Sequence, residues 1–264
     1  MRIATLFLLQ LLTLCAFAAQ PPIDLAHNDL VDLSYAFDEH TLYWPSSPSG
    51  FELKQLAYGP TPRGYFYSSY LYSAPEHGGT HLDAPIHFNE HGITNDQIPL
   101  TQLVAPAVVI DVTAKTAKDA DYRLTPEDVR AFEAKHGRIA KGTVVLLRTG
   151  WGKRYGDRKA YFGDDAPGAT DHLHFPSFGA EAAKLLVNER HVAAIGLDTA
   201  SIDYGPSTDF IVHRIVMGAQ VPGFENVANL DRLPATGAWV IALPMKIAGG
   251  SGGPLRVVAL VPKK

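Results

Sequence analysis

The middle of the chain constrains its fold most, because apolar segments of strand length alternate there with a segment of helical character. Residues 142–149 and 192–198 are two largely apolar runs. Between them, Ala182, Leu185 and Leu186 repeat at the spacing of one helix face. Strand–helix–strand units of this kind build α/β domains, in which helices pack against a sheet. The sequence therefore predicts an α/β fold.

The flanking segments extend this pattern. A helix is expected over residues 125–135, with Thr125 as its N-cap, Pro126 in its first turn and Gly137 as its stop. The remaining predicted elements are strands over 29–35, 51–58, 64–73, 107–112, 238–244 and 255–262 and a short helix over 209–218. We find no internal repeat and no linker-like seam. The prediction is one domain around a mixed β-sheet.

The N-terminus has the features of a secretory signal peptide. Arg2 supplies a positive charge, residues 3–17 are mostly apolar, and residues 16–18 have the small-x-small form of a cleavage site. A short membrane anchor and a buried N-terminal helix are the alternatives. We expect a signal over residues 1–18 and a mature domain over 19–264 that is exported, to the periplasm or outside the cell, with no stable membrane span after cleavage.

Composition narrows the function. The only cysteine, Cys15, lies inside the expected signal, so the mature chain can form neither a disulfide nor a thiolate site. The net charge is −4, and the longest basic cluster is confined to residues 153–159, which argues against nucleic acid as a partner. Stability is then expected from the core, from a metal or from oligomerisation.

A dense histidine cluster carries the chemistry. Four histidines, namely His77, His81, His87 and His91, fall within fifteen residues around Asp83. Imidazole nitrogens and carboxylate oxygens are the ligands that zinc and manganese prefer, and the interleaved glycines and proline favour a loop around an ion over a helix. Two imidazoles and one carboxylate leave coordination positions open for water, as catalytic sites do.

The roles within the cluster differ. His77, His81 and Asp83 form the expected ligand set, and a bound divalent ion can lower the pKa of water from 15.7 to about 7. His87 is expected either as a further ligand or as a proton carrier, since the ordinary pKa of imidazole is about 6.5. His91 is expected to be a plain loop residue. The alternative for the whole cluster is four surface histidines.

The segment from His77 to Phe88 resembles the HxGTHxDxPxHF signature of the cyclase/kynurenine formamidase superfamily, which includes isatin hydrolase. The resemblance covers most of the mature chain. Further segments that resemble the family, in the expected order, are 32–34 with 44–45, 198–203, 209–213 and 224–230. The last of these departs from the family pattern, because Val227 stands where the pattern has leucine.

The resemblance implies a swivelling β/β/α fold, an oligomer and one or two zinc or manganese ions. The implied ligands are His77, His81 and Asp83 for one ion, and Asp83, His213 and Glu225 for a second. It also implies that His87 transfers protons beside them. Without the resemblance, a lone helix histidine and a lone glutamate are more often surface residues than ligands.

The implied activity is hydrolysis of a non-peptide C–N bond in an aryl formamide or a cyclic amide, such as N-formylkynurenine or isatin. Trp44, together with aromatic residues of 65–72, is expected to line a slot for this planar, small-molecule substrate. A signal peptide weakens the kynurenine assignment, because that pathway is normally intracellular. The alternatives are a lactone or polyketide-like substrate, and a secreted metal-dependent binding protein without turnover. A homodimer or homotetramer is expected.

Overall fold

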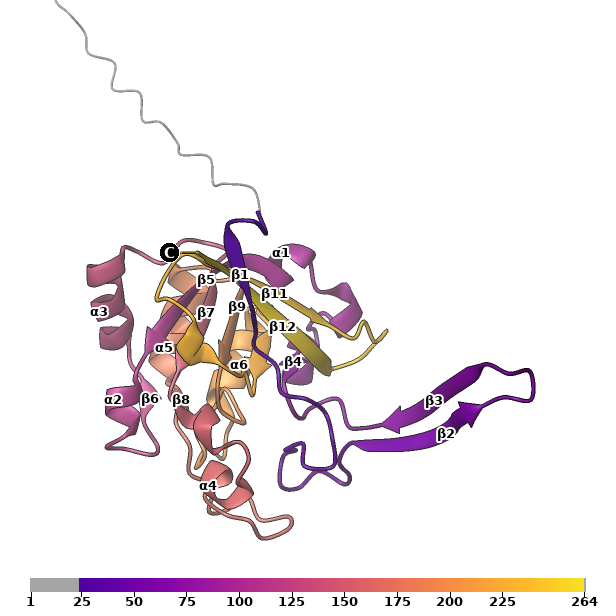
Figure 1. Cartoon of the computed structure of the whole chain (residues 1–264). Helices are drawn as coiled ribbons and strands as arrows, with labels where there is room; N and C mark the ends of the chain where they lie inside the picture. Colours follow the sequence, from indigo (N-terminus) through magenta and orange to yellow (C-terminus); the bar gives the residue numbers. More distant parts are fainter. Residues whose placement is uncertain (1–23, 264) are drawn as a thin grey trace, which may run out of the picture.

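An eight-stranded mixed sheet organises the chain in the computed structural model, which describes residues 24–263 (Figure 1). The expected signal peptide lies outside the described residues. The strands follow the order β1-β12-β11-β5-β7-β9-β10-β4, and β12 also pairs with β4, so the sheet closes into a barrel. Their bounds are β1 Asn28–Asp32, β4 His81–Asp83, β5 Val104–Asp111, β7 Val144–Arg148, β9 Ala194–Leu197, β10 Gly223–Glu225, β11 Ala238–Pro244 and β12 Gly252–Pro262.

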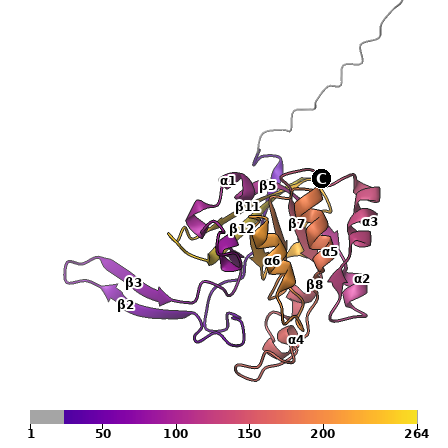
Figure 2. The same cartoon turned by 180° about the vertical axis from the view of Figure 1, so that it is seen from behind.

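The predicted strand–helix–strand units form the parallel part of the sheet. Strands β5, β7, β9 and β10 are parallel neighbours, and the other pairings are antiparallel. Helices α3 (Pro126–His136), α5 (Ala180–Lys184) and α6 (Ile211–Gly218) lie on one side of these strands (Figure 2). The α/β fold with a mixed sheet is therefore confirmed.

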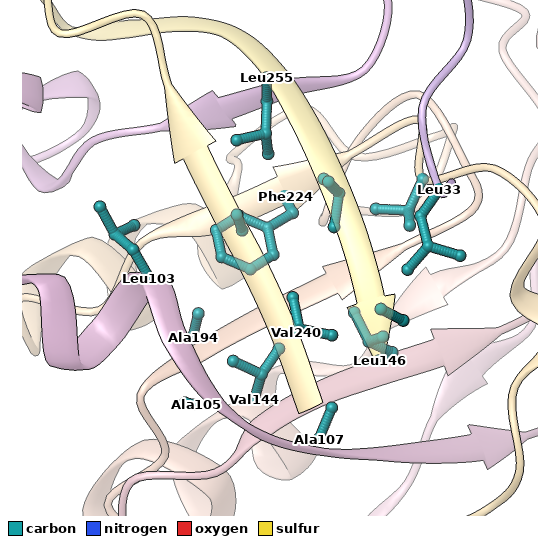
Figure 3. Packing of buried hydrophobic residues seen from close by; sticks show 14 of the residues in the cluster. Leu33, Leu103, Ala105, Ala107, Val144, Leu146, Ala194, Phe224, Val240 and Leu255 are labelled. Atoms are coloured by element: carbon teal, nitrogen blue, oxygen red, sulfur yellow. The ribbon is translucent and has the colours of Figure 1, made fainter. Parts of the chain in front are cut away.

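Strand β7 shows how the core is divided. Val144 and Leu146 point into the barrel, where they pack with residues such as Phe224 and Val240 (Figure 3). The alternate residues Val145 and Leu147 instead belong to the core between the sheet and the helices. Successive strand side chains point to opposite faces, so a strand buried on both faces must be apolar throughout. This explains the continuous apolar run in the sequence.

The predicted helices form with small differences. Helix α3 begins after Thr125, whose Oγ1 accepts a hydrogen bond from the Asp128 amide at 3.2 Å, and it ends at Gly137 with φ of 90°. The helix that the spacing of Ala182, Leu185 and Leu186 predicts is α5 followed by a π-helical turn, Leu185–Glu189. No helix among residues 24–263 is long and apolar enough to cross a membrane.

Strands β2 (Glu52–Pro60) and β3 (Phe66–Ser73) are not part of the barrel. Within the described residues they pair only with each other, and they form a hairpin that projects away from the body of the molecule (Figure 1). The sequence predicted both strands but not their separation from the sheet. The remaining short elements are α1 (Leu100–Leu103), α2 (Thr113–Thr116), β6 (Arg123–Leu124), α4 (Arg158–Phe162) and β8 (Ser177–Phe178).

Candidate metal centre

Strand β4 carries the centre of the site. His81 and Asp83 are two residues apart on a strand, so their side chains point to the same face. The expectation of an ion-binding loop is wrong for these residues, because β4 is hydrogen-bonded to both β10 and β12. The chain then turns through a 3₁₀ helix, Pro85–His87, which returns His87 to the cluster. Both His81 and Asp83 are almost completely buried.

Glu225 reaches the site from the neighbouring strand. The β10–β4 register places Glu225 directly opposite His81, and paired residues share a face of the sheet. Glu225 Oε2 lies 3.5 Å from His81 Nε2, and His81 Nε2 lies 3.1 Å from Asp83 Oδ1. A pairing between strands more than a hundred residues apart thus brings the glutamate to the histidine motif.

His213 enters from helix α6. Its Nε2 lies 3.4 Å from Asp83 Oδ2 and 3.3 Å from Glu225 Oε1. Its Nδ1 faces Asp203 Oδ2 at 2.7 Å. The structure therefore brings His213 and Glu225 to Asp83, as the resemblance to the family implied.

His77 and His87 complete the cluster on its more open side. His77 Nδ1 lies 2.6 Å from Asp83 Oδ1, and the rings of His77 and His87 stack with their centroids 3.8 Å apart. Ligand atoms of His77, Asp83 and His87 all lie within 4.8 Å of one another, so His87 is also within reach of a shared ion. The side chain of His91 is 87% exposed and lies outside the cluster.

The carboxylates have a charge balance that suits a cation. Burial opposes ionisation of Asp83, but His81, His213 and His77 hold the pKa of Asp83 well below its ordinary value. Burial and the neighbouring Asp83 raise the pKa of Glu225. Among residues 24–263, Asp83 Oδ2 is buried without a hydrogen-bond partner, which is costly for a polar oxygen. A divalent cation would satisfy this oxygen, so the donor set fits a metal.

His87 has a different electrostatic environment from the other histidines. Burial, reinforced by His77 and His213, lowers the pKa of His87 to about 4, although Asp83 opposes the shift. His87 is therefore a neutral imidazole near pH 7, and a neutral imidazole can accept a proton.

A cavity of about 250 Å³ opens beside these residues. Trp44 lines it, as predicted, and its ring lies 6.1 Å from that of Phe210 and 6.4 Å from that of Phe175. The expectation that residues 65–72 contribute is wrong for the single chain, because β3 lies on the projecting hairpin. The apolar and aromatic lining residues that the sequence analysis missed are Leu42, Tyr43, Phe88, Phe162, Ala200 and Phe210.

Three polar residues near the ligands also escaped sequence reasoning. Asp203 binds the ring of His213, and Ser251 and Glu76 lie behind His77. Asp203 is the last residue of the 198–203 segment that resembles the family, and this resemblance could have identified it as a site residue. Ser251 stands in a Gly-Gly-Ser-Gly-Gly run that carries no such signal in the sequence.

Comparisons with known proteins identify the family of this chain. The Cyclase family model matches residues 31–204. An isatin hydrolase from Roseibium aggregatum is 39% identical over 71% of this chain and 73% of its own length. A kynurenine formamidase from Salinibacter ruber is 30% identical over 69% of this chain and 74% of its own length.

Solved structures agree on the fold. An isatin hydrolase bound to the product analogue thioisatinate has a TM-score of 0.82 and 31% identity, over 90% of this chain and 94% of its own. Isatin hydrolase A from Ralstonia solanacearum has a TM-score of 0.80 and 35% identity, over 89% of this chain and 93% of its own. The expected fold and family are thereby confirmed, and with them the expectation of an enzyme. The chain is a hydrolase and belongs to the cyclase family.

Proposed function

We propose that the protein is a metal-dependent hydrolase that opens the C–N bond of a cyclic amide of the isatin type. One observation carries the proposal: three histidines and the Glu225 carboxylate converge around Asp83 beside an aromatic cavity. The ligands are His77, His81 and Asp83 for one ion, and Asp83, His213 and Glu225 for a second. The names of the similar proteins support cyclic amides and aryl formamides as the substrate class.

The donor set favours zinc or manganese, because imidazole and carboxylate ligands suit both. When bound, such an ion polarises a carbonyl and makes hydroxide available near neutral pH. The chain's own part is to hold the ligands in place, through Asp203 behind His213 and the β10–β4 pairing behind Glu225.

His87 is the proposed proton carrier. It is neutral near pH 7 and stacks on His77 at the edge of the cluster, so it can take a proton from water and return it to the leaving nitrogen. Trp44, Phe88 and Phe210 are the proposed walls for a planar ring, since all three line the cavity. They would exclude bulk water from the reacting bond.

The choice of isatin over N-formylkynurenine has two supports. The isatin hydrolase relative is the more similar of the two, at 39% against 30% identity. In addition, the proposed signal over residues 1–18 would place the enzyme in the periplasm or outside the cell, away from an intracellular pathway. N-terminal sequencing of the secreted protein tests the export, which requires a mature chain that begins near residue 19.

The activity is tested on the purified protein with isatin, N-formylkynurenine and an aryl lactone, with and without chelator. We expect bound metal and chelator-sensitive turnover of isatin. Absence of metal would refute the proposal, and metal without turnover of any substrate would favour the binding protein. Preference for the lactone would favour the alternative hydrolase or cyclase.

Variants separate the proposed roles. Asp83→Ala should lose metal, because it removes a ligand common to both ions. His87→Ala should keep metal and lose most activity, on the order of 10²- to 10⁴-fold for a general base. His91→Ala is the matched control and should resemble the wild type. If His87→Ala empties the site, His87 is a ligand and its proposed role is wrong.

We further propose a homodimer, or a homotetramer built from it, in which the β2–β3 hairpin contacts a second copy. The hairpin residues Leu53, Tyr58, Phe66, Tyr70 and Tyr72 are 44–65% exposed, and the register places them on one face. A two-stranded hairpin alone is marginally stable in water. Nine large apolar side chains between residues 53 and 72, on both faces of the hairpin, are about half exposed, which amounts to roughly 900 Å² at about 200 Å² each, so the second copy would have to cover both faces. A stable interface needs about 800 Å² per partner.

Light scattering coupled to gel filtration tests the assembly. Phe66→Glu combined with Tyr70→Glu should dissociate the oligomer into monomers, because charge would then have to be buried at the contact. Leu100→Glu places the same charge on an exposed leucine of α1 and serves as the control. A monomeric wild type, or a double variant that remains oligomeric, would refute this contact.

A further inference from the structure

A hydrogen-bonded chain runs behind His77, on the side away from the other ligands. His77 Nε2 lies 2.9 Å from Ser251 Oγ, while Nδ1 of the same ring faces Asp83. The Ser251 hydroxyl donates to Glu76 Oε2 at 2.6 Å, and the Ser251 amide donates to the same oxygen at 3.0 Å. The order of contacts is therefore Glu76, Ser251, His77, Asp83.

This order assigns the proton on His77. A serine hydroxyl has a single hydrogen, and Ser251 uses it on Glu76, so its oxygen can only accept from His77. The acceptor role requires a proton on His77 Nε2. In the neutral ring Nδ1 then carries the lone pair, which points at the Asp83 side of the cluster, where a metal ion would bind.

The backbone holds Ser251 rigidly in this position. Gly252 pairs with Asp83 in the β12–β4 register, and the Ser251 carbonyl accepts from the Ala84 amide at 2.8 Å. A Cβ at residue 250 would approach Glu76 Oε1 to 2.6 Å, and one at residue 252 would approach His77 Cε1 to 2.6 Å. Glycine on either side of Ser251 thus lets the carboxylate and the imidazole reach it.

The other two histidines of the predicted ligand set have comparable supports. His81 Nδ1 lies 3.0 Å from the Gly79 carbonyl, and His213 Nδ1 lies 2.7 Å from Asp203. Histidine ligands typically donate their second N–H to such a partner, which fixes the tautomer and raises the basicity of the ring. At His77 the corresponding acceptor is the hydroxyl of Ser251, which in turn donates to the carboxylate of Glu76.

We propose that Ser251 and Glu76 are positioning residues for metal binding by His77. They hold its proton on Nε2 and so direct Nδ1 to the ion. The inference rests on the proposed metal site and assigns two residues that lie outside the HxGTHxDxPxHF motif.

Metal affinity, measured without substrate, tests the proposal. In competition between the protein and a chelator for Zn²⁺ or Mn²⁺, Ser251→Ala should bind about 10- to 100-fold more weakly than the wild type. Ser251→Thr keeps the hydroxyl and should restore most of the affinity. Glu76→Gln should weaken binding less than Ser251→Ala, because the amide oxygen can still accept from the serine.

Asp96→Ala, which removes an acceptor of the same loop, is the matched control. Asp96 Oδ1 accepts from the Gly249 amide at 3.0 Å, so it anchors the same glycine-rich segment without contacting His77. The affinity of this variant for metal should stay at the wild-type value. An equal loss of metal affinity in Asp96→Ala and Ser251→Ala would show that loop order alone matters and would overturn the proposal.

A second readout does not depend on the folding of any variant. In zinc-loaded wild-type protein, ¹⁵N spectra of the histidine rings should show His77 coordinated through Nδ1 and protonated at Nε2. Coordination through Nε2, or wild-type affinity in Ser251→Ala, would overturn the inference while leaving the metal site intact. A wild type that binds no metal would instead refute the proposed function, and this inference with it.

Discussion

Asp203 both starts helix α6 and orients its histidine. Asp203 Oδ2 accepts from the His213 amide at 3.0 Å and lies 2.7 Å from His213 Nδ1, while Oδ1 accepts from the Val212 amide at 2.9 Å. Burial opposes charge on His213, but Asp203, Asp83 and Glu225 raise its pKa well above the ordinary value. One carboxylate therefore couples the first turn of the helix to the direction of a proposed metal ligand.

Asp203→Asn should weaken metal binding about 10- to 100-fold, because one acceptor oxygen cannot serve the ring and the helix amides together. The helix should lose roughly 1 kcal/mol of stability for one lost hydrogen bond. Chelator competition measures the first effect and urea unfolding the second. Asp209→Asn, on the same segment and hydrogen-bonded to the Ser207 hydroxyl at 3.4 Å, is the control. Unchanged affinity in Asp203→Asn would contradict the orienting role.

Metal removal should destabilise the wild type, because Asp83 and Glu225 are buried carboxylates whose charge a cation would balance. A ligand present at 100 times its Kd stabilises the folded state by about 2.7 kcal/mol. Thermal unfolding with Zn²⁺ and with chelator should therefore differ clearly for the wild type. Asp83→Asn should show almost no difference, whereas His91→Ala should keep it in full. A metal-dependent shift that survives in Asp83→Asn would contradict the central place of Asp83.

Trp44→Ala should raise the KM for an aromatic substrate about tenfold, a loss of roughly 1.4 kcal/mol, with a smaller change in kcat. Trp44 forms a wall of the cavity with Phe210, and within residues 24–263 its side chain makes no hydrogen bond to the proposed ligands. Trp44→Phe should recover most of the KM. Steady-state kinetics on metal-saturated protein measure both constants. A fall in kcat at constant KM would instead indicate a role in the chemical step.

The sequence predicts the locally determined parts of this molecule well. Helix α3 follows from Thr125, Pro126 and Gly137, whose effects act within a few residues. Strands β7 and β9 follow from apolar runs, because a strand buried on both faces must be apolar. The motif residues also lie together for a local reason, since they share one strand and its two adjoining turns.

Features that depend on pairing between distant segments are not predictable in this way. Three residues, His81–Asp83, are too few for a strand signal and become a strand only because β10 and β12 lie on either side. The β2–β3 hairpin has the composition of sheet strands, and nothing local indicates that it leaves the barrel. Ser251 approaches His77 only through the β12–β4 register. The resemblance to the family supplied His213 and Glu225, which spacing alone did not.

A last prediction concerns stability against acid at Asp128, far from the metal. Asp128 accepts from the hydroxyl of Tyr122 at 2.5 Å and from the amide of Thr125 at 2.9 Å, and it pairs with Lys115. Burial opposes its ionisation, but Lys115, Tyr122 and Thr125 lower the pKa of Asp128 below its ordinary value. A lowered pKa in the folded state contributes stability above the ordinary pKa of about 3.9, and this contribution is lost as the pH falls further.

Asp128→Asn should therefore cost roughly 1–3 kcal/mol at pH 7, the range for a buried polar group that loses a partner. The difference in the free energy of unfolding between variant and wild type should shrink below pH 4, because the wild-type carboxyl then takes up a proton. Urea unfolding in the presence of chelator, at pH 7, 4.5 and 3, measures both. Glu127→Gln removes the neighbouring exposed acid and should change stability by at most about 0.5 kcal/mol. If the free energies of unfolding of Asp128→Asn and the wild type differ by the same amount at every pH, then the shape of Asp128, and not its charge, is stabilising.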